Sequence, residues 1–223
     1  ADRVFAVVGG LAQQMLTPAG QLLTLQEAAR RVQVGLTAWS GLADKPELLS
    51  ETLALIDECK SCMIEPETLF RASKESALDE DAALSAKLCD LAQILTQYDS
   101  LCEETLPDPR DRLTHLRDGL AESHVLDGAE VYLDGFLSYT PQELAIIEVM
   151  LSSGVPLTAA VTCDVELPDV FVTGCRTLRT LTRMAERCSR RPELVDLGAG
   201  KMPRPAGLAA VANEALLPVR QAH

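Results

Sequence analysis

The sequence predicts an α/β protein in two parts, an all-helical domain over residues 1–125 and a parallel α/β domain over residues 126–223. Two observations predict this division. Before about residue 125, apolar residues recur at helical spacing, and the longest such run covers residues 79–104. After Asp127-Gly128, short apolar runs alternate with helical patterns. That alternation is typical of a parallel sheet with right-handed crossovers.

Proline marks most of the helix starts in the first part. Because proline suits the first helical position, and a polar residue such as Asp108 before it can cap the helix, these positions predict where the helices begin. The expected helices start at Arg3, Pro18, Pro46, Pro66, Asp79 and Pro109, and the last of them ends at Glu122.

The second part alternates strands with helices. Thr140, Pro141 and Glu143 form the pattern of a capping box with proline at the first helical position. The expected strands cover residues 130–133, 157–162 and 193–196, and the expected helices cover 141–152 and 173–190. The tail after Gly198 is marked by proline and glycine and predicts only a weak helix over 206–217.

Composition indicates a reduced, globular protein. Of the 223 residues, 47% are hydrophobic but only 4% are aromatic, so Leu, Ala and Val must fill the core. No run of about 18 apolar residues predicts a membrane span, and no signal segment opens the chain. Seven cysteines without framework spacing favour a cytoplasmic protein with free thiols. Because Ala1 is not an initiator methionine, we expect a piece of a longer protein.

The net charge of −13 argues against DNA binding by general attraction. The charge is uneven, however, since acids crowd residues 44–104 and residues 176–204 are basic. One strip of arginines recurs at helical spacing, opposite an apolar stripe. The strip consists of Arg176, Arg179, Arg183, Arg187 and Arg190. It is either a solvated helix face or a surface that meets DNA or a partner subunit.

The stretch VYLDGFLSYTPQEL, residues 131–144, reads as a buried strand, a turn and a helix start. Asp134 ends the strand, and open α/β sheets place ligand chemistry at the carboxyl ends of their strands. The alternative is that Asp134 only caps the turn that Gly135 permits.

Two short motifs do not predict a site. Cys59 and Cys62 form a lone CxxC, and neither a second pair nor the spacing of the histidines completes a metal site. The run Gly198 to Lys201 resembles the end of a phosphate loop. Val195 stands where that loop needs its first glycine, and Met202 where it needs a hydroxyl.

The stretch at 131–144 resembles the "DGF…FTPQE" signature of the B subunit of bacterial ATP-dependent helicase/deoxyribonucleases, the AddB or RexB family. Weaker similarities to the same family follow in the same order along the chain. They cover residues 16–23, 55–69, 84–101, 156–164 and 169–185.

The resemblance implies a helical domain inserted into a P-loop-NTPase-like parallel α/β core, of which this chain holds the part after the insertion. It implies a parent protein that processes DNA double-strand ends for recombinational repair together with an A subunit. ATP with magnesium, a nuclease domain and an iron–sulfur cluster would belong to the parent, outside this chain. In that family the helicase-like part is associated with recognising a regulatory DNA sequence. The resemblance assigns this recognition to no particular residue of this chain.

The same resemblance makes Asp134 and Gly135 a degenerate motor position. Motor ATPases of the resembled superfamily follow the strand-end Asp with a Glu that activates water. Gly135 has no side chain, and Glu143 is expected in the capping box. We therefore expect a DNA-recognition or scaffold module without a hydrolytic site or a cofactor of its own. The alternative is a non-enzymatic helical adaptor.

Overall fold

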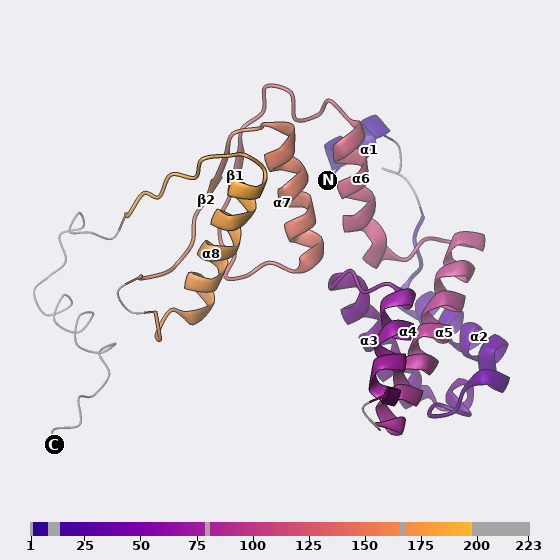
Figure 1. The fold of residues 1–223 in the computed structure, drawn as a ribbon. Helices are drawn as coiled ribbons and strands as arrows, with labels where there is room; N and C mark the ends of the chain where they lie inside the picture. Colours follow the sequence, from indigo (N-terminus) through magenta and orange to yellow (C-terminus); the bar gives the residue numbers. More distant parts are fainter. Residues whose placement is uncertain (1, 9–13, 79–80, 166–167, 198–223) are drawn as a thin grey trace, which may run out of the picture. The chain divides into compact units, whose positions relative to one another are not determined.

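The computed structural model describes residues 2–8, 14–78, 81–165 and 168–197 (Figure 1). The chain divides into two compact units. Unit 1 comprises residues 1–131 and 139–157, and unit 2 comprises residues 132–138 and 158–223. The predicted helix over 206–217 and the Gly198 to Lys201 stretch lie outside the described residues.

Unit 1 is helical, and besides the part predicted to be helical it includes residues 139–157, which the sequence placed in the α/β part. Its α-helices are α1 (Asp2–Val8), α2 (Pro18–Val32), α3 (Pro46–Ser61), α4 (Pro66–Leu78), α5 (Ala82–Glu104), α6 (Arg112–Glu122) and α7 (Pro141–Ser153). Three short 3-10 turns, η1 (Gln33–Gly35), η2 (Leu42–Asp44) and η3 (Pro109–Asp111), connect them.

Local sequence explains where several helices begin. The Thr17 side chain accepts a hydrogen bond from the backbone N–H of Gly20 (3.1 Å), and Pro18 follows as the first helical residue. Asp81 caps α5 in the same way by accepting from the N–H of Leu84 (2.9 Å). The capping box expected for α7 is present, and Gly154 ends that helix in the left-handed conformation (φ 90°).

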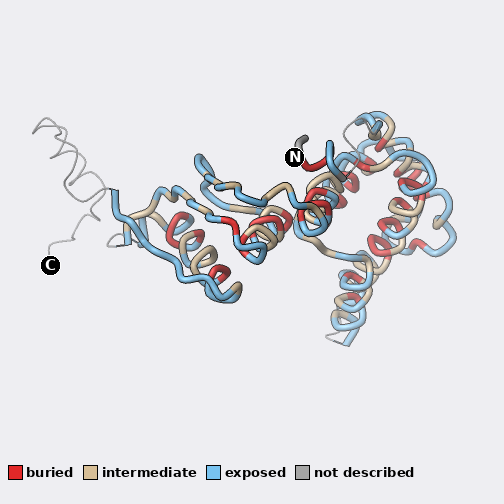
Figure 2. The backbone as a smooth tube through the Cα atoms, turned by 90° about the horizontal axis from the view of Figure 1, so that it is seen from above, coloured by how far each residue is buried: buried red, intermediate tan, exposed pale blue. Residues whose placement is uncertain are grey.

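Two hydrophobic clusters hold unit 1 together. The larger one packs α2, α3, α4 and α5 around Leu25, Ile56, Ile94 and Leu95, all almost fully buried. The smaller one joins α1, α6 and α7 through Phe5, Leu116, Leu120 and Ile146. Figure 2 shows the buried positions recurring along the helices between exposed ones, which is the amphipathic pattern that the sequence predicted.

The described residues form one small sheet. Strand β1 (Val131–Leu133) pairs with β2 (Leu157–Ala159). The N–H of Val131 donates to the carbonyl of Pro156 (2.9 Å), and the N–H of Ala160 donates to the carbonyl of Leu133 (2.8 Å). These bonds belong to a parallel ladder, so the prediction of adjacent, parallel strands is confirmed.

Helix α8 (Val172–Arg187) belongs to unit 2, where the structure corrects two predictions. The predicted helix over 173–190 ends at Arg187, because Ser189 adopts a left-handed backbone (φ 59°) and the N–H of Arg190 returns to the carbonyl of Ala185 (2.8 Å). The predicted strand over 193–196 is wrong for this chain, since these residues are neither strand nor helix. A strand needs a hydrogen-bonding neighbour, and the two-stranded sheet supplies none.

The confirmed architecture is a helical domain and a small parallel sheet. The assignment of that sheet to a P-loop-like core stays a prediction, as does a domain boundary at residue 125.

Candidate functional site

Asp134 lies in an exposed turn at the carboxyl end of β1. Its Oδ1 accepts a hydrogen bond from the backbone N–H of Gly135 (2.8 Å), so the carboxylate caps the turn that it begins. Gly135 has φ 82°, a conformation that glycine adopts without strain and that other residues resist. A glutamate at this position would therefore strain the turn.

Glu143, the next carboxylate along the chain, is held by its own helix start. Its Oε2 accepts a hydrogen bond from the N–H of Thr140 (2.7 Å), and the Thr140 hydroxyl accepts one from the N–H of Glu143 (3.3 Å). The neighbouring Gln142 is buried, and its amide nitrogen donates to the carbonyl of Arg110 (3.2 Å) and to the hydroxyl of Thr114 (3.1 Å). In the TPQE part of the signature, residues 140–143, Thr140 and Glu143 therefore cap α7, and Gln142 bonds α7 to α6.

The arginine strip lies on the exposed face of α8. Arg176, Arg179 and Arg183 are exposed, and no ion pair within the described residues engages them. Arg187 is also exposed, whereas Arg190 follows the end of the helix. The opposite stripe is buried or half-buried, as predicted. It consists of Cys175, Leu178, Leu181, Ala185 and Cys188.

Helix α8 begins against the segments that follow the two strands. The Thr177 hydroxyl donates to the carbonyl of Leu137 (2.7 Å), in the turn that follows Asp134. The Cys175 thiol contacts the carbonyl of Asp164 (3.5 Å), beyond β2. A Cβ on Gly174 would collide with the carbonyl oxygen of Thr162. The Asp134 turn and the arginine strip therefore belong to one unit, at the carboxyl edge of the sheet.

The two units differ in charge. Unit 1 contains 25 acidic and 11 basic residues, a net charge of −14. Unit 2 contains 8 acidic and 9 basic residues, a net charge of +1. The acidity that argued against DNA binding therefore resides in the helical unit, and the arginines of α8 lie outside it.

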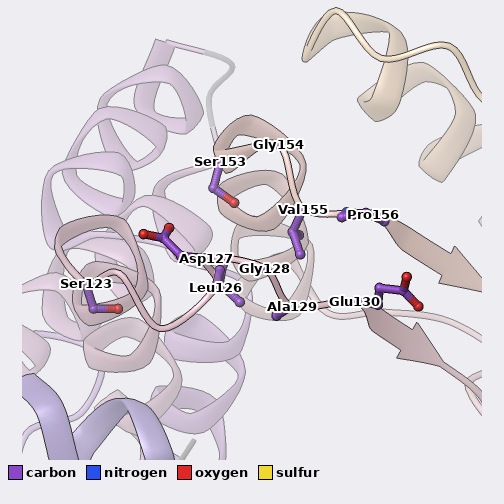
Figure 3. Close-up of a pocket in the computed structure, with 10 residues that line it drawn as sticks. All are labelled: Ser123, Leu126, Asp127, Gly128, Ala129, Glu130, Ser153, Gly154, Val155 and Pro156. Carbon is purple, nitrogen blue, oxygen red and sulfur yellow. The ribbon is translucent and has the colours of Figure 1, made fainter.

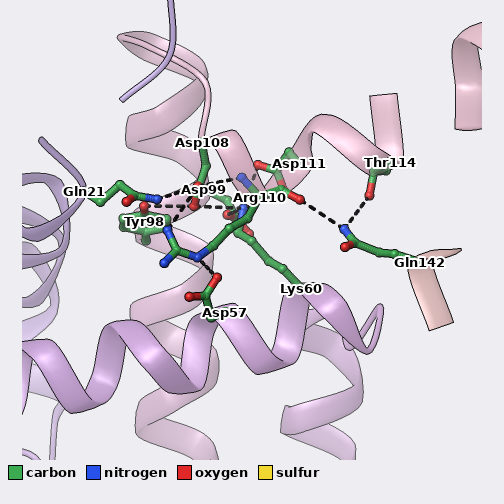
Figure 4. A network of polar contacts seen from close by, with 10 residues as sticks. All are labelled: Gln21, Asp57, Lys60, Tyr98, Asp99, Asp108, Arg110, Asp111, Thr114 and Gln142. Atoms are coloured by element: carbon green, nitrogen blue, oxygen red, sulfur yellow. Dashed lines mark hydrogen bonds and ion pairs between the residues drawn. The ribbon is translucent and has the colours of Figure 1, made fainter. Parts of the chain in front are cut away.

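A partly buried ionic network in unit 1 was missed by sequence reasoning (Figure 4). Lys60 is almost buried and lies 2.8 Å from Asp99, 2.7 Å from Asp111 and 3.8 Å from Asp108. Asp108 is fully buried and accepts hydrogen bonds from the Tyr98 hydroxyl (2.9 Å) and from the amide of Gln21 (2.8 Å). The available signal was a lysine beside the apolar stripe of α3, next to Cys59.

Burial and charge together decide the protonation of this network. Burial lowers the pKa of Lys60, but the carboxylates of Asp99 and Asp111 outweigh burial, so its pKa is raised above the ordinary value. Burial, followed by the charge of Asp108, raises the pKa of Tyr98. Lys60 is therefore a charged structural residue, and its three acidic neighbours are occupied by internal contacts.

The remaining motifs do not form a site in the described residues. Cys59 is buried, Cys62 is exposed, and both are free thiols. Within the described ranges, no group of three or more His, Cys, Asp or Glu side chains could hold a metal ion.

A cavity of about 400 Å³ opens in unit 1 beside Gly128, Glu130, Ser153 and Pro156 (Figure 3). It lies before the first residues of β1 and β2, whereas open α/β sheets place their ligand chemistry beyond the carboxyl ends. No cysteine, histidine or basic side chain is among the ten residues that line it. Its polar side chains are those of Ser123, Asp127, Glu130 and Ser153.

No helix among the described residues combines the length and the apolar character needed to cross a membrane.

Comparison with known proteins agrees with the signature. The family described as "ADDB, N-terminal" matches residues 1–201. The chain is 35% identical over 153 residues to the B subunit of an ATP-dependent helicase/deoxyribonuclease of Symbiobacterium thermophilum, a match that covers 68% of this chain and 13% of the relative. It is 30% identical over 191 residues to the protein of the same name in Acetivibrio thermocellus, covering 83% of this chain and 16% of that relative.

The chain thus spans less than a fifth of the length of these relatives. The match to the family extends over the helical unit, the sheet and α8 alike. The chain therefore belongs to the family of AddB N-terminal regions.

Proposed function

We propose that this chain is the helicase-like N-terminal module of an AddB protein that, with a partner A subunit, processes DNA ends in the cytoplasm. In this proposal the module contacts DNA through the exposed arginine face of α8 and hydrolyses no ATP itself. The observation that carries the proposal is the arrangement of Arg176, Arg179 and Arg183 on one exposed helix face, in the unit that lacks the acidic excess.

The geometry of α8 supports contact with phosphates. At a rise of about 1.5 Å per residue, Arg176, Arg179 and Arg183 are displaced by roughly 4.5 and 6 Å along the helix axis. Three neighbouring guanidinium groups can therefore meet neighbouring backbone phosphates. The rest of α8 is packed within unit 2, so the helix offers one flank to a nucleic-acid backbone.

The test is a salt titration of DNA binding with charge-reversed variants. Replacing Arg176, Arg179 and Arg183 by Glu should lower affinity at least about ten-fold and reduce the salt slope by about 2 to 3, since three phosphate contacts are lost. The matched control replaces the exposed Arg71, Lys74 and Lys87 of unit 1 by Glu, with the same change in net charge. Equal effects of the two triple variants would contradict a binding role for α8.

The absence of hydrolysis rests on the two carboxylate positions. Gly135 supplies no carboxylate after Asp134, and Glu143 is engaged in the capping box. Phosphate release by the full-length protein alone should therefore stay at background, with or without DNA, in the wild type and in Asp134→Ala. Robust turnover that Asp134→Ala abolishes would show that Asp134 is catalytic.

A further inference from the structure

Two cysteines of unit 2 meet where the start of α8 packs against the segment that follows β2. Cys163 is half-buried in that segment, and Cys175 is buried in the first turn of α8. Both are free thiols. Neither of them belongs to the arginine strip or to the turn at Asp134, so the proposed function leaves this pair without a role.

Backbone and side-chain contacts bring the two thiols together. A Cβ on Gly174 would collide with the carbonyl oxygen of Thr162 and lie 3.0 Å from the Cβ of Cys163, so the helix start touches the chain beside Cys163. The Cys175 thiol donates a hydrogen bond to the carbonyl of Asp164 (3.5 Å), the residue after Cys163. The Cys163 thiol in turn donates to the sulfur of Cys175. The two sulfur atoms are therefore neighbours in the fold.

A small cavity leaves room for these sulfurs to move closer. It has a volume of about 140 Å³ and is lined by Cys175 together with Val165, Pro168, Leu178 and Arg179. A disulfide needs its sulfurs at about 2.05 Å, which two neighbouring thiols reach by rotating their side chains. Because a cavity borders Cys175, its sulfur can rotate without displacing packed neighbours, and such displacement is what makes changes in a dense interior costly.

We propose that Cys163 and Cys175 are a redox-active pair that closes into an intrachain disulfide, with a small-molecule disulfide such as oxidised glutathione as the oxidant. Cys163, the more exposed of the two, attacks one sulfur of the oxidant as a thiolate, forms a mixed disulfide and releases one glutathione thiolate. Cys175 then attacks the sulfur of Cys163 and expels the second glutathione thiolate. The two cysteines lose two electrons to the oxidant, and their two protons pass to the two glutathione thiolates.

The reduced pair is the resting form. Burial, followed by the neighbouring Cys175 thiol, raises the pKa of Cys163, so little thiolate is present at neutral pH. Such a pair stays reduced in a reducing compartment and closes slowly under an excess of oxidant. The disulfide joins the first turn of α8 to the segment after β2 and thereby fixes the helix that carries the arginine strip. The pairing of the thiols holds whether or not α8 binds DNA.

Peptide mapping tests the proposal directly. Glu166 is the single glutamate between the two cysteines, so a glutamate-specific protease separates them into peptides 149–166 and 167–186, each with one cysteine. The native 223-residue chain and the full-length protein are incubated with oxidised glutathione, and free thiols are blocked before digestion. The two peptides should be recovered joined and should separate in dithiothreitol. Recovery of the two peptides unlinked, whether blocked or carrying glutathione, overturns the proposal.

Serine variants identify the two partners. Cys163→Ser and Cys175→Ser should each abolish the link between the two peptides, and Cys175→Ser should retain glutathione on Cys163. The control is Cys62→Ser, which removes the exposed thiol of the CxxC pair in unit 1 and should leave the link intact. Loss of the link in Cys62→Ser to the same extent would overturn the assignment, because the disulfide would then depend on exchange through Cys62.

A comparison of the native and the unfolded chain shows whether the fold builds the pair. The equilibrium constant for closing the disulfide with glutathione is measured in buffer and in concentrated urea with the wild-type chain. It should be at least about ten-fold larger in the native chain, because the fold already holds the sulfurs in contact and the disulfide in turn stabilises the fold. Equal constants overturn the proposal, since the link would then reflect only the closeness of the two cysteines along the chain.

Discussion

The ammonium group of Lys60 in α3 lies 2.7 and 2.8 Å from the two carboxylate oxygens of Asp111 in η3. This contact joins the helical bundle to the 3-10 turn that leads into α6. Asp99 and Asp108 face the same ammonium group, and Arg110 pairs with Asp57 beside them. The stability of unit 1 therefore depends on one lysine that compensates several carboxylates.

Lys60→Met should destabilise unit 1 by about 3 kcal/mol, because removing one member of a buried ion pair leaves the others uncompensated. Urea unfolding followed by circular dichroism measures the change. Lys87→Met, at an exposed position of α5, serves as the control and should change stability by less than about 0.5 kcal/mol. Equal effects of the two substitutions would show that the network contributes little.

The same network predicts a loss of stability at alkaline pH. Burial raises the pKa of Cys102 to about 12, and the pKa values of Tyr98 and Lys60 are also raised in the folded state. The unfolded chain loses these protons first, from about pH 8.5 for cysteine and about pH 10 for tyrosine and lysine. Stability is therefore complete below about pH 8.5 and is lost as pH rises toward the folded-state pKa values.

Urea midpoints should accordingly be similar at pH 7 and 8 and fall between pH 9 and 11. Lys60→Met should show a shallower fall, since one of the three contributions is gone. A midpoint that is constant up to pH 10.5 would contradict this linkage.

Asp90→Ala should loosen the loop after η1. The Asp90 Oδ2 accepts hydrogen bonds from the backbone N–H groups of Thr37 (2.9 Å), Ala38 (2.7 Å) and Trp39 (2.9 Å). Removing the buried carboxylate leaves these three N–H groups without their acceptor. We expect the free energy of unfolding to fall by about 3 kcal/mol.

Trp39 is the single tryptophan of the chain, so its fluorescence should shift to the red as the loop opens. Asp118→Ala removes an exposed carboxylate that pairs with the adjacent Arg117 and should leave the emission unchanged. An unshifted spectrum in Asp90→Ala would mean that the loop holds its shape by other contacts.

Gly174→Ala should destabilise unit 2, because the added methyl group would collide with the backbone carbonyl of Thr162 and press on Cys163. We expect the free energy of unfolding to fall by about 2 kcal/mol and the thermal midpoint to be lower. Gly20→Ala is the matched control within α2, where the new methyl group meets only side chains. It should be neutral or stabilising, since alanine favours the helix. A stable Gly174→Ala protein would show that α8 can shift away from β2 at little cost.

Much of the local structure followed from the sequence alone. Thr140, Pro141 and Glu143 determined the start of α7, and the apolar stripe of α8 determined which face the arginines expose, because caps and helical periodicity act within a few residues. The parallel pairing of β1 and β2 was also predictable, since a strand, a helix and a second strand in this order favour it.

Tertiary structure alone decided the rest. Lys60 and Asp111 are 51 residues apart in the sequence and meet only in the folded protein. No local sequence pattern encodes that contact. Residues 193–196 have the sequence of a strand but are not one in this chain, because a strand exists only through hydrogen bonds to a neighbour, and propensity cannot supply the neighbour. The sequence by itself therefore determined the helix starts and the exposed faces, whereas contacts between distant residues decided which charges are buried and which segments become strands.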